Sequence, residues 1–228
     1  MQQRILTSLG VSDARVFVRG VDRPNISLLR WNVPSTQRPQ IIAQLCQISP
    51  PKGKVMIFVP TRRIGEALQK YLRDRGLETP FYHSQLSSAW EREQHVKRFV
   101  GESRPIVDRI ICTSAFGMGL DVSDVRMVIH WQHPSSVEDY LQEFGRAGRD
   151  GRPSVAVLLH TPRGKSDDIG LLRFMAKKAV ESARLDTQTE ALAHKARQIE
   201  AIARLVGQDG CFRGALVNRP GFAGGCFV

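Results

Sequence analysis

The feature that most constrains the fold of this chain is a repeated alternation of short apolar runs with helical patterns. The run VMIFVP at 55–60 is apolar throughout and short, which is typical of a strand buried on both faces of a parallel sheet. Further strand patterns lie at 27–33, 80–83, 109–114, 127–131 and 154–160. Strands and helices that alternate through short links predict an α/β fold: a three-layer arrangement with an open, mostly parallel sheet and right-handed crossovers.

Capping patterns mark where the helices between these strands begin. A helical pattern covers 37–48, and a second helix is expected between a Thr61 cap and Gly76, which stands where a C′ glycine belongs. Two capping boxes, each a serine followed three residues later by a glutamate, open two further helices: Ser88 with Glu91, and Ser135 with Glu138.

Two helical patterns follow the last strand, near 168–182 and 188–206. The tail from Gly207 is rich in glycine, so we expect it to be irregular and poorly ordered. The chain is therefore expected to comprise a leading segment (1–25), an α/β domain (26–163), a small helical extension (164–208) and a tail (209–228).

Composition narrows the function classes. The formal net charge is +11, and arginine greatly outnumbers lysine, which favours binding of phosphate or nucleic acid. A merely solvated basic surface is the alternative. No stretch approaches the ~20 apolar residues that a bilayer requires, and the N-terminus lacks a signal-peptide pattern. The four scattered cysteines favour a reducing, intracellular location: the cytoplasm or nucleoid of a bacterium, or a nucleus.

Ligands of open α/β sheets bind at the carboxyl ends of the strands, so we expect the functional residues in the loops there. Thr61-Arg62-Arg63 stands at an expected helix N-terminus, where free N–H groups favour an anion. Thr113 and Ser114 offer hydroxyls before a glycine-containing loop at 115–121. A helix cap and a tight turn are the structural alternatives for these two features.

A third loop, 142–151, carries Arg146 and Arg149. If the preceding helix continues through them, the two arginines share one face and converge on one phosphate chain at the same ligand-bearing rim. A solvated helix end is the structural alternative.

Taken in order, these strings resemble a known family. IFVPTR (57–62), YHSQL (82–86), the stretch 111–131 and YLQEFGRAGRDGRP (140–153) resemble motifs IV, V and VI of superfamily 2 helicases, and in particular the second RecA-like motor domain of the RecQ family. DRPN at 22–25 resembles the stretch that leads into that domain. The resemblance runs from about Gln3 to about Val217.

The resemblance implies a nucleotide site shared with another domain. In such helicases ATP with Mg²⁺ lies between two RecA-like domains. Arg149 then matches the arginine finger, Arg146 its partner near the phosphates, and Gln142 opens the motif. Gly119 and Asp121 match positions close to the nucleotide.

The resemblance also implies contacts to nucleic acid. Thr61, Arg62, Thr113 and Ser114 match positions that hold the backbone of a single strand. The expected partners are single-stranded or forked DNA, and a first motor domain in cis or in trans.

Two features of the complete helicase motor are missing from these 228 residues. The first motor domain carries a P-loop and an Asp-Glu box, and neither occurs in this sequence. Gly164-Lys165-Ser166 looks like the end of a P-loop, but Leu159 stands where its first glycine is required. We therefore expect the chain alone to bind nucleic acid weakly and to hydrolyse no ATP.

The resemblance extends into a zinc module that RecQ helicases carry after the motor. Residues 194–217 resemble its helix and first cysteine, Cys211, and Cys226 stands where a second ligand is conceivable. Two cysteines do not complete a tetrahedral site, so no bound zinc is expected. His130 and His133 are expected to be structural histidines.

Three functions remain open at this point. The first is the second motor domain of a RecQ-like 3′-to-5′ DNA helicase. The second is a non-catalytic nucleic-acid-binding or regulatory module derived from one. The third is a self-sufficient NTPase built on 164–166.

Overall fold

The computed structural model describes residues 22–48, 53–86, 88–114, 116, 122–161, 168–181 and 188–217. Its contacts divide the chain into two compact units, Arg23–Phe212 and a smaller one made of Met1–Asp22 with Arg213–Val228. In the smaller unit, Arg213 pairs with Asp22. The larger unit holds the sheet and the candidate site.

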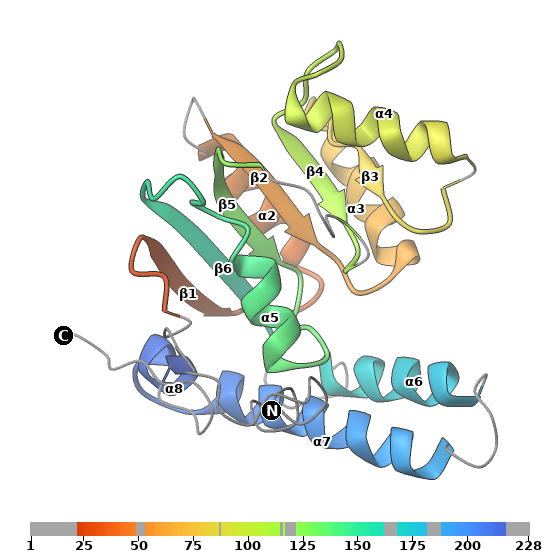
Figure 1. The fold of residues 1–228 in the computed structure, drawn as a ribbon, viewed down its shortest axis with the longest axis vertical. Coiled ribbons are helices and arrows are strands. Elements are labelled where there is room, and N and C mark those ends of the chain that lie inside the picture. The colour runs from red at the N-terminus through yellow and green to blue at the C-terminus, as the bar shows by residue number, and fades with distance from the viewer. Residues whose placement is uncertain are drawn as a thin grey trace, which may run out of the picture. The chain divides into compact units, whose positions relative to one another are not determined.

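The larger unit is built on one fully parallel sheet of six strands (Figure 1). The strands are β1 (Ile26–Asn32), β2 (Lys54–Phe58), β3 (Phe81–Tyr82), β4 (Arg109–Cys112), β5 (Val125–His130) and β6 (Ser154–His160). Their order across the sheet is β1-β6-β5-β2-β4-β3, so β1 and β3 form opposite edges. The predicted α/β class is confirmed.

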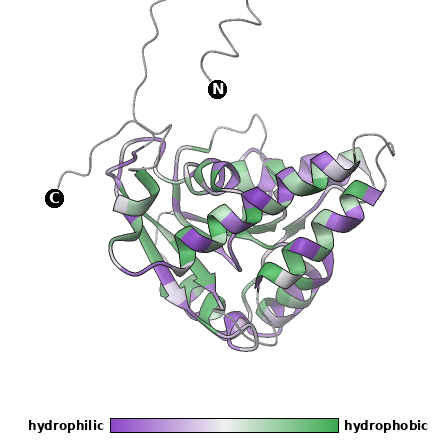
Figure 2. Ribbon diagram, turned by 90° about the horizontal axis from the view of Figure 1, so that it is seen from below, coloured by the Kyte–Doolittle hydropathy of each residue, from purple (hydrophilic) through white to green (hydrophobic). Residues whose placement is uncertain are grey.

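Helices cover both faces of this sheet. On one face, α2 (Arg38–Ile48) and α3 (Arg62–Arg73) pack their apolar residues onto side chains such as Val55 and Ile57 of β2. On the other face lie α4 (Ala89–Val100) and α5 (Val137–Phe144) (Figure 1). There Phe58 stacks on His130 with ring centroids 5.2 Å apart, and His130 in turn contacts Tyr140 of α5 at 5.0 Å. The strands are mostly hydrophobic, whereas the helices carry both characters (Figure 2), as a buried sheet between amphipathic helices requires.

Most of the predicted caps are present. The Thr61 and Ser88 side chains accept hydrogen bonds from N–H groups three residues on, at 3.3 and 3.0 Å. Gly76 has φ +73° and donates to Arg73 O, while Leu77 donates to Leu72 O, which is a Schellman ending.

The predicted cap of α5 is wrong by one residue. Ser136 caps the helix by accepting from Asp139 N at 3.0 Å, whereas Ser135 donates to the Asp139 carboxylate at 2.8 Å. Two adjacent serines each have an acidic residue three positions on, so the sequence pattern fits either register.

Two helices follow the sheet in the chain, α6 (Asp168–Glu181) and α7 (Gln188–Gly207). They pack on each other through Leu172, Ala176 and Ile199. A buried ion pair fixes the start of α6: Arg38, fully buried, donates to Asp168 at 2.9 Å. The expectation of an irregular tail from Gly207 is corrected in part, because α8 (Phe212–Val217) is helical. No helix among the described residues is long and apolar enough to cross a membrane.

Candidate functional site

The carboxyl ends of β2, β4 and β3 form one continuous edge. Val59, just past β2, donates its N–H to Cys112 O at 2.9 Å, and Thr113, just past β4, donates to Tyr82 O at 3.3 Å. The predicted strand-binding residues therefore stand at the ends of neighbouring strands. We call Thr61, Arg62, Thr113 and Ser114 the carboxyl-edge site.

Three properties of this site suit an anion. Thr61 is half-buried and its hydroxyl oxygen accepts the cap bond, which leaves its O–H able to donate. Arg62 and Ser114 are exposed, and α3 has no acidic residue in its first turn, so its N-terminal dipole is not offset there. Arg62 does bond Glu66 at 2.6 Å, but both side chains are about half exposed and such pairs are weak.

The second group of predicted residues, Arg146 and Arg149, lies in a loop and not on a continuation of helix α5. Helix α5 ends at Phe144, and residues 145–150 form successive turns, so Arg146 and Arg149 do not share one helical face. We call residues 145–152 the arginine loop.

The arginine loop is also anchored at the other edge of the sheet. Gly148 donates its N–H to the carbonyl of Val125, the first residue of β5, at 2.9 Å. The expectation that both arginines sit on the carboxyl rim is thus corrected for the loop backbone. The reason is topological: α5 starts beyond the carboxyl end of β5 and runs back, so the loop after it reaches the amino edge.

Two side chains just before β1 clamp the arginine loop by its carbonyl groups. Arg23 donates to the carbonyls of Gly145, Ala147 and Gly148 at 3.2, 3.2 and 2.9 Å. Asn25 donates to the carbonyls of Gly148 and Arg152 at 2.8 and 3.1 Å. One short stretch therefore satisfies four carbonyls of an irregular loop, which defines its path.

Gly148 is the point of closest approach in this clamp. Its φ of +55° lies in the left-handed region, and a Cβ there would come within 2.5 Å of Asn25 Nδ2 and 2.9 Å of Arg152 O. Both the backbone angle and the lack of space therefore call for glycine.

The two flanks of the arginine loop are held by side-chain contacts. Upstream, Glu143 and His130 are both buried and lie 3.0 Å apart, which ties the end of α5 to β5. Downstream, Asp150 pairs with Arg126, which also donates to Ser154 Oγ at 3.2 Å. The hydrogen bond from Arg126 lowers the pKa of Asp150, so this carboxylate is ionised at neutral pH.

Within this frame, Arg146 is half-buried and Arg149 is exposed. Burial lowers the pKa of Arg146, and the positive charge of Arg149 acts in the same direction, whereas Cys112 and Glu143 oppose it. A guanidinium nevertheless stays protonated at neutral pH. A bound polyanion reduces the electrostatic repulsion between two positive charges that are close enough to influence each other. Gln142, also a predicted site residue, is exposed on α5.

Several predicted positions fall outside the described residues: Gly119, Asp121, the loop at 164–166 and Cys226. Among the residues that the structure does describe, no group of three or more His, Cys, Asp or Glu side chains is placed to hold a metal ion. His130 bonds Glu143, and His133 contacts Pro134 O at 3.0 Å, so each histidine makes a contact within the fold.

Sequence reasoning missed Arg23, Asn25 and Arg126. DRPN was noted only as a stretch of family resemblance, and Arg126 only as part of the motif stretch 111–131. The available signal was the position of an arginine and an asparagine directly before an edge strand, where long donors meet the irregular backbone of a neighbouring loop.

Comparison with known proteins bears on the whole unit. Residues 37–151 match the family described as the helicase conserved C-terminal domain. This chain belongs to the helicase C-terminal domain family. It is 34% identical over 219 residues to the ATP-dependent DNA helicase RecQ of Pasteurella multocida, which covers 95% of this chain and 32% of that protein. The RecQ helicase of Haemophilus influenzae is 33% identical with the same coverage. The resemblance to the RecQ family is confirmed.

The chain spans about a third of the length of these relatives. Among solved structures, Saccharomyces cerevisiae Dbp5 bound to RNA and ADP BeF3 matches with a TM-score of 0.61 and 19% identity, over 86% of this chain and 52% of that one. At this identity the match concerns the fold, and it agrees with a RecA-like helicase C-terminal domain.

Proposed function

We propose that this chain acts as the second motor domain of a RecQ-type, ATP-dependent 3′-to-5′ DNA helicase. In this role the arginine loop faces ATP and Mg²⁺ that are held by a P-loop-bearing first motor domain, in the same polypeptide or in a separate one. The observation that carries the proposal is the arginine loop itself, which is clamped by Arg23 and Asn25 while it leaves Arg149 exposed.

The arginine loop suits a triphosphate chemically. A guanidinium offers paired N–H donors that match phosphate oxygens, and Arg149 is placed on a held backbone rather than on a loose one. ATP supplies the phosphoanhydride bond whose cleavage drives the motor. Arg149 would neutralise charge that develops on the γ-phosphate, a contribution of about 10³ to 10⁵ in rate in related NTPases. Arg146, Gln142, Gly119 and Asp121 complete the proposed nucleotide contacts.

The carboxyl-edge site suits the backbone of a single strand. Threonine and serine hydroxyls, an exposed arginine and a helix N-terminus all bind phosphate oxygens without reading bases. Such contacts fit an enzyme that moves along any sequence. That the Dbp5 structure, with a similar fold, contains both RNA and ADP BeF3 supports assigning two ligands to this fold.

Both proposed sites are built on the same sheet, which suits a motor domain. The backbone of the arginine loop is attached at the amino edge of the sheet, and the strand contacts lie at the carboxyl edge. In this proposal both groups of residues belong to one sheet, so a movement of the domain that follows ATP hydrolysis also moves the bound strand. Within this proposal, residues 1–25 lead in from the first motor domain and 26–163 form the motor domain. The extension (164–208) and tail (209–228) follow and hold no zinc.

The test is ATP hydrolysis in the presence of single-stranded DNA. We expect no turnover from the chain alone, and turnover when a separately produced first motor domain with a P-loop is added. Turnover by the chain alone at the rate of an intact helicase would refute the proposal.

A non-catalytic nucleic-acid-binding module is the second candidate. The net charge of +11 and the exposed Arg62 favour it, because neither requires a nucleotide. It predicts DNA binding that weakens steeply with salt and no ATP turnover with any first motor domain.

A further inference from the structure

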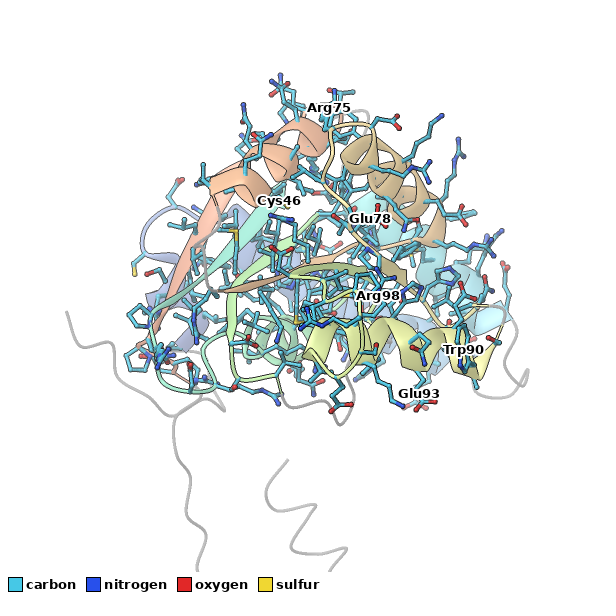
Figure 3. The ribbon with its side chains drawn as sticks, turned by 90° about the horizontal axis from the view of Figure 1, so that it is seen from above. Cys46, Arg75, Glu78, Trp90, Glu93 and Arg98 are labelled. Atoms are coloured by element: carbon cyan, nitrogen blue, oxygen red, sulfur yellow. The ribbon has the colours of Figure 1, made fainter. Side chains whose placement is uncertain are left out.

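Trp90 is an unusually exposed tryptophan. It lies in the first turn of α4 and is 68% exposed, whereas Trp31 is 36% and Trp131 8% exposed. Figure 3 shows Trp90 at one end of α4, with Glu93 nearby and Arg98 farther along the helix. A side chain of this size normally contributes its large apolar area to a core or an interface.

Trp90 follows β3 in the chain, and β3 lies next to β4 in the sheet. The loop from His83 to Ser88 leaves the carboxyl end of β3 and leads directly into α4. Thr113 bonds Tyr82 O, so this loop begins beside the carboxyl-edge site. Arg62 lowers the pKa of His83 and Glu91 raises it, after the larger effect of burial, which places the starts of α3 and α4 near the same histidine.

The residues that lead into α4 are hydrogen-bonded, and charges of both signs lie close to Trp90 in the sequence. Arg92 donates to Leu86 O at 2.9 Å, and Leu86 donates to His83 O at 3.2 Å. Next to Trp90, the Glu93 carboxylate is paired with Lys97 at 2.7 Å. Arg92 and Glu91 place one charge of each sign on the first turns of α4. The surroundings of the indole ring therefore neither attract nor repel phosphate strongly, and the ring is the feature available for contact.

We propose that Trp90 is a stacking platform for an unpaired base of the single strand held at the carboxyl-edge site. The inference rests on the proposed function and extends it by one subsite. Nucleobases stack on exposed aromatic rings whatever their sequence, which adds grip without adding sequence preference. The net charge of +11 and the phosphate-binding groups on the adjoining strands favour nucleic acid over a protein as the occupant.

Stacking and phosphate binding leave different signatures in salt. Loss of a stacked base lowers affinity by a similar factor at every salt concentration, since no counterions are released there. Loss of a phosphate contact reduces the slope of affinity against salt. We therefore expect Trp90→Ala to weaken binding by roughly 5- to 150-fold with an unchanged slope, and Arg62→Ala to reduce the slope.

The experiment titrates the complete chain with short oligothymidine and oligouridine, followed by intrinsic tryptophan fluorescence and by anisotropy of a labelled oligonucleotide. We expect quenching that disappears in Trp90→Phe, an affinity that Phe retains in part, and loss in Trp90→Ala. The two oligonucleotides show whether the base subsite takes DNA, RNA or both. Trp31→Ala is the control, because Trp31 lies on β1 at the opposite edge of the sheet, and it should leave the affinity for both oligonucleotides unchanged.

The inference fails if Trp90→Ala binds the oligonucleotides as tightly as the parent chain while Arg62→Ala binds them more weakly. In that case the carboxyl-edge site stands without its base subsite. If the parent chain binds neither oligonucleotide, both the inference and the proposed strand contacts fail. Tryptophan fluorescence that neither oligonucleotide quenches, although both bind, would also overturn the inference.

Discussion

Replacing Gly148 with alanine tests whether the clamp on the arginine loop is as tight as the structure indicates. The new Cβ would lie 2.5 Å from Asn25 Nδ2, 2.8 Å from Ser154 Oγ and 2.9 Å from Arg152 O. One of these atoms belongs to the backbone and two to side chains that are hydrogen-bonded in place, so the neighbours cannot simply rotate away.

The expected cost has two parts. An alanine at φ +55° carries about 1–2 kcal/mol of backbone strain, and forcing a methyl group into a filled space adds about 1–3 kcal/mol. Gly151 is the matched control, because its φ is +79° but a Cβ there meets nothing within 4 Å. Gly151→Ala should therefore lose only the strain, about 1–2 kcal/mol, and Gly148→Ala about 2–5 kcal/mol in total.

Urea unfolding of the parent chain and both variants measures this difference directly, provided that the slope of stability against urea is unchanged. Equal losses for the two alanine variants would refute the reasoning, because they would mean that the space around Gly148 is not filled as described.

Three further predictions follow from named contacts. Arg23→Ala removes three hydrogen bonds to the arginine loop, so amide hydrogen exchange should speed up at 146–151 and not in β2; unchanged exchange there would contradict the clamp. Asp168→Asn leaves Arg38 buried without its carboxylate and should cost about 3–5 kcal/mol in urea unfolding, against under about 1 kcal/mol for Asp124→Asn, whose pair with Lys54 is partly exposed. Burial lowers the pKa of four histidines below the usual value of about 6.5. The unfolded chain therefore binds more protons than the folded one, and the free energy of unfolding should fall as pH drops below about 6.5. A urea midpoint that stays constant between about pH 7.5 and 5.5 would refute this. The histidines are His83, His95, His133 and His160.

The strands and the helix caps were predictable because their signals are local. The run 55–60 is apolar on both faces and forms β2 in the middle of the sheet, and 154–160 matches β6 residue for residue. Thr61 and Gly76 define the ends of α3 through hydrogen bonds that span only a few residues, so nothing distant overrides them.

The position of the arginine loop was not predictable in the same way. The motif string identifies Arg146 and Arg149 as a pair, but the edge of the sheet that they reach depends on the length of α5 and on where its chain turns back. The clamp joins Arg23 to Gly148 across more than a hundred residues of sequence, and no local pattern reports such a contact. The choice between Ser135 and Ser136 as a cap is a smaller case, in which two registers fit the sequence and packing of α5 selects one.

The most direct test of the account is the effect of Arg149 on ATP hydrolysis once the chain is paired with a P-loop-bearing first motor domain. We predict that Arg149→Ala lowers kcat by about 10³ to 10⁵ at saturating single-stranded DNA while the affinity for the oligonucleotide stays the same. Arg62→Ala should instead weaken the affinity for the oligonucleotide and leave kcat at saturating DNA unchanged. A variant at Arg149 that keeps kcat within a few-fold of the parent would contradict the assignment of the arginine loop to the nucleotide.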